Sequence, residues 1–169
     1  MANKKSVMIK TGKNIFEGAV AVVIGILLAW MINARNVHFV NGESMEPTLH
    51  DGQIVYVEDA KDMQLEKGMI VIAAAPDGNT IIKRVIGCPE DTIALDADGK
   101  VVINGEKEQR GFDSIFRERE GNLESGMIVR LSGNDYYLMG DNRNYSTDSR
   151  VYGAFDKSKI LYVVKKIIW

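Results

Sequence analysis

The chain has 169 residues, of which 46% are hydrophobic, and a formal net charge of −2. This length suffices for one domain with a core, and the weakly acidic balance excludes a general electrostatic attraction to nucleic acid. A single cysteine, Cys88, excludes an intrachain disulfide, and His38 and His50 form no zinc-ligand spacing with it. We therefore expect no metal and no cofactor.

The first predicted element is a membrane-spanning helix. Four lysines precede any acidic residue, and the stretch from Asn14 to Ala34 then carries Glu17 as its one charge. Its 21 residues match the roughly 20 that span a bilayer. Lysines on the N-terminal flank favour a cytoplasmic N-terminus. We predict a cytoplasmic segment over 1–13, a single transmembrane helix over 14–34, and an extracytoplasmic domain over 35–169, all held at the cell membrane.

Two other interpretations of this segment stay open. A cleaved signal peptide has an apolar region of about 7–15 residues, and the uncharged run Gly18–Ile32 is at the upper edge of that range. However, Ile32–Ala34 is a poor small-x-small cleavage site. A buried core helix would carry its apolar residues on one face, whereas here they lie all round.

From position 37 onward the pattern is that of short strands rich in β-branched residues, separated by turn formers. Turns are predicted at Asp77–Asn79, Asp98–Gly99, Asn104–Gly105 and Ser132–Asp135. This pattern indicates a mainly β domain, an antiparallel sheet or barrel, with a charged, solvated accessory excursion around 105–126. The predicted strands are Val37–Asn41, Gln53–Glu58, Met69–Ala75, Thr80–Gly87, Thr92–Leu95, Lys100–Asn104, Met127–Leu131, Tyr136–Met139 and Ile160–Ile168.

One predicted bend and one predicted strand carry residues suited to nucleophilic catalysis. Ser44 stands on a predicted bend, and a serine hydroxyl needs a base to take its proton. Lys83 stands in an apolar strand, where desolvation lowers a lysine pKa from its usual value near 10.4 by up to about 3–5 units. Arg84 alternates to the other face, so that it can point outward while Lys83 points inward. Serine–lysine pairs are a known variant of the serine-nucleophile arrangement.

A third segment, Gly140–Arg150, packs turn formers, hydroxyls and opposite charges together. With Ser44–Leu49 and Lys83–Asp91 it gives three motifs in order behind an N-terminal anchor. In these motifs the chain resembles the bacterial type I signal peptidases over nearly its whole length. The short spacing between the second and third motifs is similar to the compact Gram-positive members of that family.

The resemblance implies a role for each matching residue. Ser44 is expected to be the nucleophile and Lys83 the general base. Ser146 is expected to orient Lys83, and Asp148 and Arg150, with Asp141 nearby, to brace the site. The remaining expectations concern the substrate and the oxyanion: Val40, Met45, Leu49, Ile81 and Ile82 would contact substrate, and the backbone of Ser44 and Gly42 would stabilise the oxyanion.

The same resemblance implies the partners. Secretory preproteins would be cut after small-x-small sites such as Ala-x-Ala, close to the secretion translocon and in contact with membrane lipid. An extended substrate would pair with a sheet edge between Val37–Asn41 and Thr80–Lys83, since strand addition supplies main-chain hydrogen bonds and pockets for alternate side chains.

Two positions depart from the family pattern. Glu90 stands where the family usually has glycine, which is the default residue at positive φ. Gly42 stands where some members carry a serine that donates to the oxyanion, and one lost donor can cost about 2.7–4 kcal/mol.

Two other functions compete with the peptidase hypothesis. A self-cleaving regulator shares the Ser–Lys pair and a related β fold, but usually has a DNA-binding domain where this chain has an apolar segment. A catalytically silent anchored module is the other alternative, against which the presence of all the expected catalytic residues argues.

Overall fold

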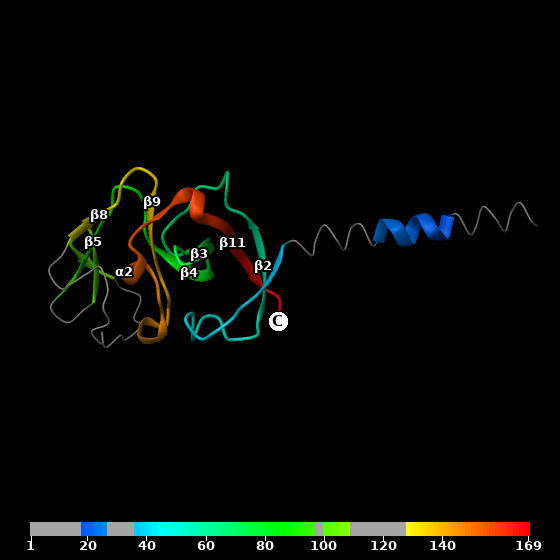
Figure 1. The fold of residues 1–169 in the computed structure, drawn as a ribbon, viewed down its shortest axis with the longest axis horizontal. Coiled ribbons are helices and arrows are strands. Elements are labelled where there is room, and N and C mark those ends of the chain that lie inside the picture. Colours follow the sequence, from blue (N-terminus) through cyan, green and yellow to red (C-terminus); the bar gives the residue numbers. More distant parts are fainter. Residues whose placement is uncertain (1–17, 27–35, 97–99, 109–127) are drawn as a thin grey trace, which may run out of the picture. The chain divides into compact units, whose positions relative to one another are not determined.

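The computed structural model describes residues 18–26, 36–96, 100–108 and 128–169. Contacts divide the chain into two units, Met1–Val37 and His38–Trp169. The described part of the first unit is a helix over 18–26 (Figure 1). No helix among the described residues is both long and apolar enough to cross a membrane. Most of the predicted span 14–34 lies outside the described residues, so the anchor stays a prediction.

Seven strands form the larger sheet of the second unit, in the order β1-β2-β11-β3-β4-β9-β10. Each pair for which a register is recorded is antiparallel. The sheet joins strands from both ends of the chain, because the C-terminal β11 lies between β2 and β3 (Figure 1). Its strands are β1 (Val37–Phe39), β2 (Ile54–Asp59), β3 (Ile70–Ala74), β4 (Thr80–Gly87), β9 (Asp135–Met139), β10 (Phe155–Asp156) and β11 (Ile160–Ile167).

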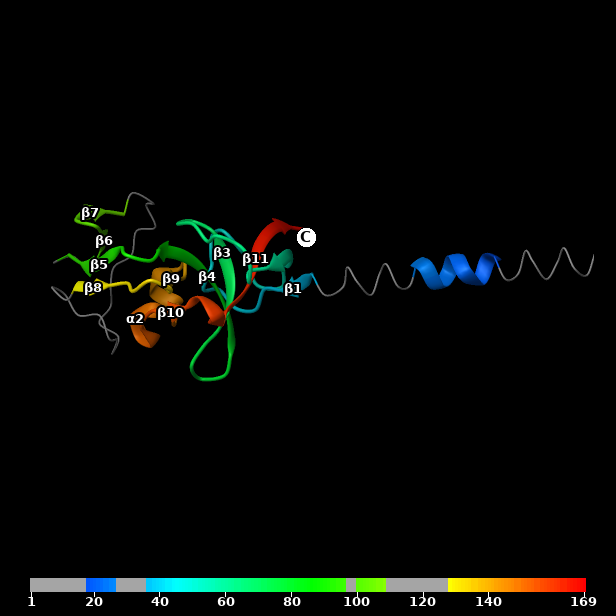
Figure 2. The ribbon, with the colours of Figure 1, turned by 90° about the horizontal axis from the view of Figure 1, so that it is seen from above.

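A smaller antiparallel sheet has the order β7-β6-β5-β8. Its strands are β5 (Thr92–Leu95), β6 (Val101–Ile103), β7 (Glu106–Lys107) and β8 (Ile128–Arg130). They lie together at the end of the domain away from β11 (Figure 2). The predicted mainly β, antiparallel class and all nine predicted strands are therefore confirmed.

Two strands were not predicted. β7 occupies the start of the stretch expected to be a solvated excursion, and the residues 109–127 of that stretch lie outside the described part. Asn104 and Gly105 have φ of 53° and 87°, the left-handed values of the hairpin turn that this dipeptide favours. The turn was predicted, but the strand after it was missed because it has only two residues. β10 is equally short.

The core is divided into three apolar clusters. One surrounds Val85 and Leu138 between β3, β4 and β9; a second joins Ile86 and Tyr137 to the small sheet; a third packs Met45 and Leu49 against β2 and β3. β4 is buried on both faces at its end, which suits the apolar residues Val85 and Ile86 there.

The described part of the domain also has three short helical turns: η1 (Arg143–Tyr145), α2 (Ser149–Tyr152) and η2 (Lys157–Lys159). The hydroxyl of Ser149 accepts a buried hydrogen bond from the Leu138 backbone N–H at 2.8 Å. This bond ties α2 to β9 and so places the third motif beside the sheet.

Candidate active site

Ser44 lies on the turn between β1 and β2 and is half-buried. The turn is held by backbone hydrogen bonds from Thr48 and Leu49 to the Met45 carbonyl, both 2.9 Å long. Met45 and Leu49 are 1% and 0% exposed. Because these side chains anchor the turn in the core, the Ser44 hydroxyl is presented from a fixed backbone.

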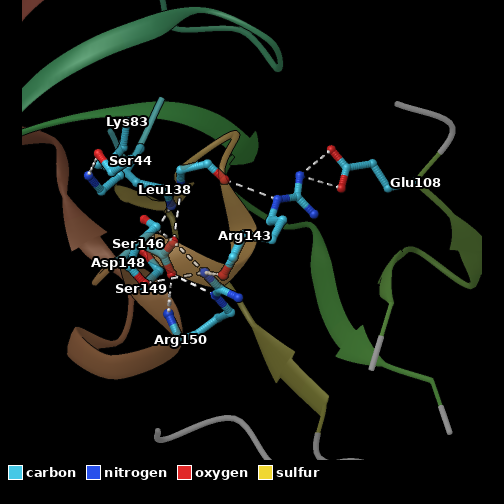
Figure 3. Close-up of polar contacts among 10 residues, drawn as sticks. Ser44, Lys83, Glu108, Leu138, Arg143, Ser146, Asp148, Ser149 and Arg150 are labelled. Carbon is cyan, nitrogen blue, oxygen red and sulfur yellow. Dashed lines mark hydrogen bonds and ion pairs between the residues drawn. The ribbon is translucent and has the colours of Figure 1, made fainter. Parts of the chain in front are cut away.

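Lys83 reaches Ser44 from the middle of β4. Its Nζ donates to Ser44 Oγ at 2.8 Å (Figure 3). It also donates to the Ile82 carbonyl at 2.9 Å. The residue is 4% exposed. Desolvation lowers the pKa of Lys83 to about 8, with the nearby Asp148 charge opposing the shift and Arg150 adding to it. The structure thus places a lysine with a lowered pKa in hydrogen-bond contact with a serine hydroxyl.

Asp148 organises the third motif and is 0% exposed. It accepts hydrogen bonds from the Ser146 hydroxyl at 2.6 Å, the Gly140 N–H at 3.0 Å, and Nε and Nη2 of Arg150 at 2.8 and 2.9 Å (Figure 3). Burial raises the pKa of Asp148, but the Arg150 hydrogen bonds and charge, together with the Ser146 and Gly140 bonds, bring it below its usual value. Asp148 therefore stays ionised.

The expected contact between Ser146 and Lys83 is absent from the described structure. The Ser146 hydroxyl donates to Asp148 instead, and the second partner of Lys83 Nζ is the Ile82 carbonyl. A hydroxyl that donates to a carboxylate keeps lone pairs that accept from an ammonium, so this bond leaves Ser146 able to accept from Lys83. In this structure Ser146 is linked to Asp148, whose charge acts on Lys83 from a distance. Direct orientation of Lys83 by Ser146 stays a prediction.

Arg84 is paired with Asp141, which corrects the expectation that its side chain points outward. Nε donates to one Asp141 oxygen at 2.7 Å, and Nη2 forms a second, shorter contact with the other. Thr48 also donates to Asp141, at 2.6 Å. The opposite face of β4 is covered by the turn that follows Ser44, so Arg84 joins all three sequence motifs. Breaking such a buried pair typically costs about 3–5 kcal/mol.

Gly140 allows the third motif to approach Ser44. A Cβ at this position would overlap the Ser146 hydroxyl and would lie 2.5 Å from the Ser44 carbonyl oxygen. Real Cβ atoms do not come this close, so any side chain here would displace one of the two site segments.

The two expected oxyanion donors differ. The Gly42 N–H donates to the Asp51 carboxylate at 2.7 Å, so it is already occupied, and the expectation for Gly42 is corrected. Gly42 has φ +85°, a value that suits glycine. The Ser44 N–H has no acceptor among the residues described here, which leaves it free to donate.

The five residues expected to contact substrate fall into two groups. Val40, Met45 and Leu49 are buried in the third core cluster, at 3%, 1% and 0% exposure. They support the Ser44 turn from inside, and their contact with substrate stays a prediction. Ile81 and Ile82 are half-buried on β4. Over Thr80–Lys83, the described part of the chain pairs β4 with β3 alone, because β9 begins pairing at Arg84.

Two residues that contact the site segments were missed by sequence reasoning. Asn142 donates from its backbone N–H to the Ser44 carbonyl at 3.0 Å and from Nδ2 to the Glu43 carbonyl at 3.1 Å. Its position inside the third motif was the signal from which a contact with the site could have been predicted. Glu108 pairs with Arg143 at 2.8 Å, and no local pattern marks it.

Glu90 has the left-handed backbone conformation expected of the glycine that the family usually has at this position. Its φ is +71°, in the left-handed region. The turn keeps the glycine-like backbone and carries the steric cost of a side chain there. Glu90 lies on the surface, paired with Arg130 at 3.0 Å, away from Lys83.

Comparisons with known proteins agree with this arrangement. A family model described as signal peptidase, peptidase S26, matches residues 12–169. Signal peptidase I S of Bacillus subtilis (strain 168) is 34% identical over 98% of this chain and 95% of its own length. Signal peptidase I of Bacillus licheniformis is 35% identical over 87% of this chain and 84% of its own.

A solved structure of a signal peptidase I from Enterococcus faecalis V583 aligns with a TM-score of 0.49 and 21% identity, over 61% of this chain and 98% of that one. On the family match and the two sequence relatives, the chain belongs to the signal peptidase family, peptidase S26, and is a serine peptidase of the signal peptidase I type, which cleaves signal peptides.

Proposed function

We propose that this chain is a membrane-anchored endopeptidase that removes signal peptides after small-x-small sites, with Ser44 as nucleophile and neutral Lys83 as general base. The observation that carries the proposal is the 2.8 Å contact between Lys83 Nζ and Ser44 Oγ, made by a lysine that is 4% exposed. A lysine that keeps its proton donates this bond. Once deprotonated, the amine accepts from the hydroxyl at the same separation.

The proposed reaction begins from the deprotonated Lys83, which accepts the hydrogen bond of the Ser44 hydroxyl. Neutral Lys83 takes the Ser44 proton while Oγ attacks the scissile carbonyl, giving a tetrahedral intermediate and a lysine ammonium. The ammonium then protonates the leaving amine, and the peptide bond breaks to leave an acyl-enzyme. Water, deprotonated by the same amine, releases the acid product and restores Ser44.

Stabilisation of the oxyanion falls to the Ser44 N–H in this proposal. It is the donor of the expected pair that remains free among the described residues. Because Asn142 holds the carbonyls of Glu43 and Ser44, the peptide units on both sides of the nucleophile are fixed before substrate arrives. A preorganised donor of this kind costs no reorganisation in the transition state.

The substrate is proposed to pair with the open edge of Thr80–Lys83, on the side that faces away from β3. The unpaired edge of β4 over these four residues supports this placement. Strand addition would carry alternate substrate side chains toward the sheet, and Ile81 and Ile82 are the half-buried residues there. Small pockets at alternate positions along this edge would account for the proposed preference for small-x-small sequences.

The anchor is the predicted span 14–34, with a cytoplasmic N-terminus and the catalytic domain outside the cytoplasm. The apolar composition of this stretch and the lysines before it support the assignment. The partners are secretory preproteins emerging near the translocon, together with membrane lipid.

The test uses the full chain in detergent and a model preprotein with an Ala-x-Ala site. Wild type is expected to cut after that site, and Ser44→Ala to be inactive. Lys83→Arg keeps the charge but cannot act as a base, so it is also expected to be inactive. Cleavage by Ser44→Ala would remove Ser44 from the proposed role, and activity of Lys83→Arg would remove Lys83. Mass spectrometry of the enzyme itself detects self-cleavage, the signature of the competing regulator.

A further inference from the structure

Glu108 stands just after β7, outside the three sequence motifs, yet its carboxylate contacts the third motif. Nη2 of Arg143 donates to one of its oxygens at 3.0 Å and forms an ion pair with the other at 2.8 Å (Figure 3). The Arg143 and Glu108 side chains are 4% and 10% exposed, so water screens this pair little. Removing one member of such a pair leaves an uncompensated charge in a poorly solvated place.

Arg143 is attached to the catalytic framework at two further points. Its Nε donates to the Gly140 carbonyl at 3.1 Å, and its own carbonyl accepts from Nη2 of Arg150 at 2.7 Å. Within the described ranges, Glu108 is the one carboxylate paired with Arg143. The guanidinium therefore connects the loop 140–145 to the small sheet.

The same loop touches the backbone of Ser44. Asn142 donates to the Ser44 carbonyl at 3.0 Å. Gly140 lies so close that a Cβ on it would be 2.5 Å from the same carbonyl oxygen. A shift of this loop therefore passes directly to the nucleophile, with no flexible side chain between them to absorb it.

We propose that Glu108 is a positioning residue, which acts through Arg143 to fix the 140–145 loop and so the position of Ser44 Oγ relative to Lys83 Nζ. The inference rests on the proposed role of Ser44. It makes the small sheet part of the apparatus that sets the catalytic geometry. A misplacement of about 1 Å arising far from the chemistry can lower a rate by about 100-fold.

The experiment compares two charge-removing variants of the full, detergent-solubilised chain. Glu108→Gln removes the partner of Arg143 and keeps the side-chain shape. Glu106→Gln is the matched control, because Glu106 lies two positions earlier, is exposed, and changes the net charge equally. We expect kcat of Glu108→Gln to fall by about tenfold or more, with KM within about twofold, while Glu106→Gln matches wild type.

Folding and catalysis are separated by measuring urea unfolding of each variant and correcting kcat for the folded fraction. A corrected kcat of Glu108→Gln equal to that of Glu106→Gln overturns the proposal. If Glu108→Gln does not fold, Glu108→Asp takes its place, since it keeps the charge but draws the carboxylate back. Wild-type kcat in Glu108→Asp then overturns the proposal.

A Ser44→Ala arm distinguishes this inference from the function on which it rests. If Ser44→Ala still cleaves the peptide, the nucleophile assignment fails, whatever Glu108 does. If Ser44→Ala is inactive and Glu108→Gln retains full corrected kcat, the positioning role alone fails.

Discussion

Changing the pH tests the proposed base most directly. Burial sets the pKa of Lys83 at about 8, against a starting value of 10.5. At pH 7 about a tenth of the chains then carry a neutral amine, compared with about 3 in 10,000 for an unperturbed lysine. Desolvation thus raises the active fraction by about 300-fold. We expect kcat/KM to rise about tenfold per pH unit below this pKa and to level off above it.

The assay measures kcat/KM from pH 5.5 to 10 on a peptide that has no group titrating in that range. A chain with a blocked N-terminus serves as control, because an α-amino group titrates at about 7.7–8.0. A His38→Gln/His50→Gln variant removes the imidazoles. A profile that is flat across this range, or half-maximal near 10.5, would refute the reasoning that burial prepares Lys83 as a base.

Three further predictions concern stability and packing. Gly140→Ala is expected to lower kcat/KM by about 100-fold, because its Cβ would overlap the Ser146 hydroxyl. The control Gly133→Ala should match wild type, because no atom lies within 4 Å of a Cβ at that position. Equal activities of the two variants would contradict the idea that Gly140 is needed for the close approach to Ser44. Glu90→Gly should raise the free energy of unfolding by about 0.5–1 kcal/mol in urea titrations. The steric strain that a left-handed φ causes in glutamate is larger than the stability that glycine loses through the higher entropy of the unfolded chain. A lower free energy of unfolding would contradict this. Lys83→Met should have a free energy of unfolding that is higher than that of wild type at pH 7, by at most about 3 kcal/mol. The reason is that the pKa of Lys83 is lower in the folded chain than in the unfolded one, so burial of its ammonium destabilises the fold fully below about pH 8 and not at all above pH 10.5. A difference between the variant and wild type that is equal at pH 7 and pH 10 would count against a buried ammonium.

The strands were predictable because they depend on local composition. β-branched runs bounded by turn formers marked all nine of those predicted. β7 and β10 were not predicted, because a strand of two residues is too short to show an alternating pattern. Each is defined by its pairing with a neighbouring strand, β6 and β9 respectively. The four-residue α2 is too short for a helical pattern.

The candidate site was predictable where its residues form motifs, and less so where contacts join distant segments. Ser44 and Lys83 lie 39 positions apart yet meet in the structure, and their motifs made that expectation possible. Simple alternation along β4 placed Arg84 in solvent, because it takes no account of the turn that covers the second face of the sheet. Glu108 has its partner 35 positions away, and nothing in its neighbours announces the pair.

The three ion pairs around the proposed base all take their cation from arginine. Arg84, Arg143 and Arg150 are 11%, 4% and 9% exposed in their pairs with carboxylates. A guanidinium keeps its proton across the working range of any enzyme, whereas a lysine in the same place would release its proton when buried. As the medium becomes alkaline, Lys83 therefore loses its proton beside arginines, a residue type that is not deprotonated in proteins. Among these four cations, Lys83 is thus the one whose charge a change of pH can switch.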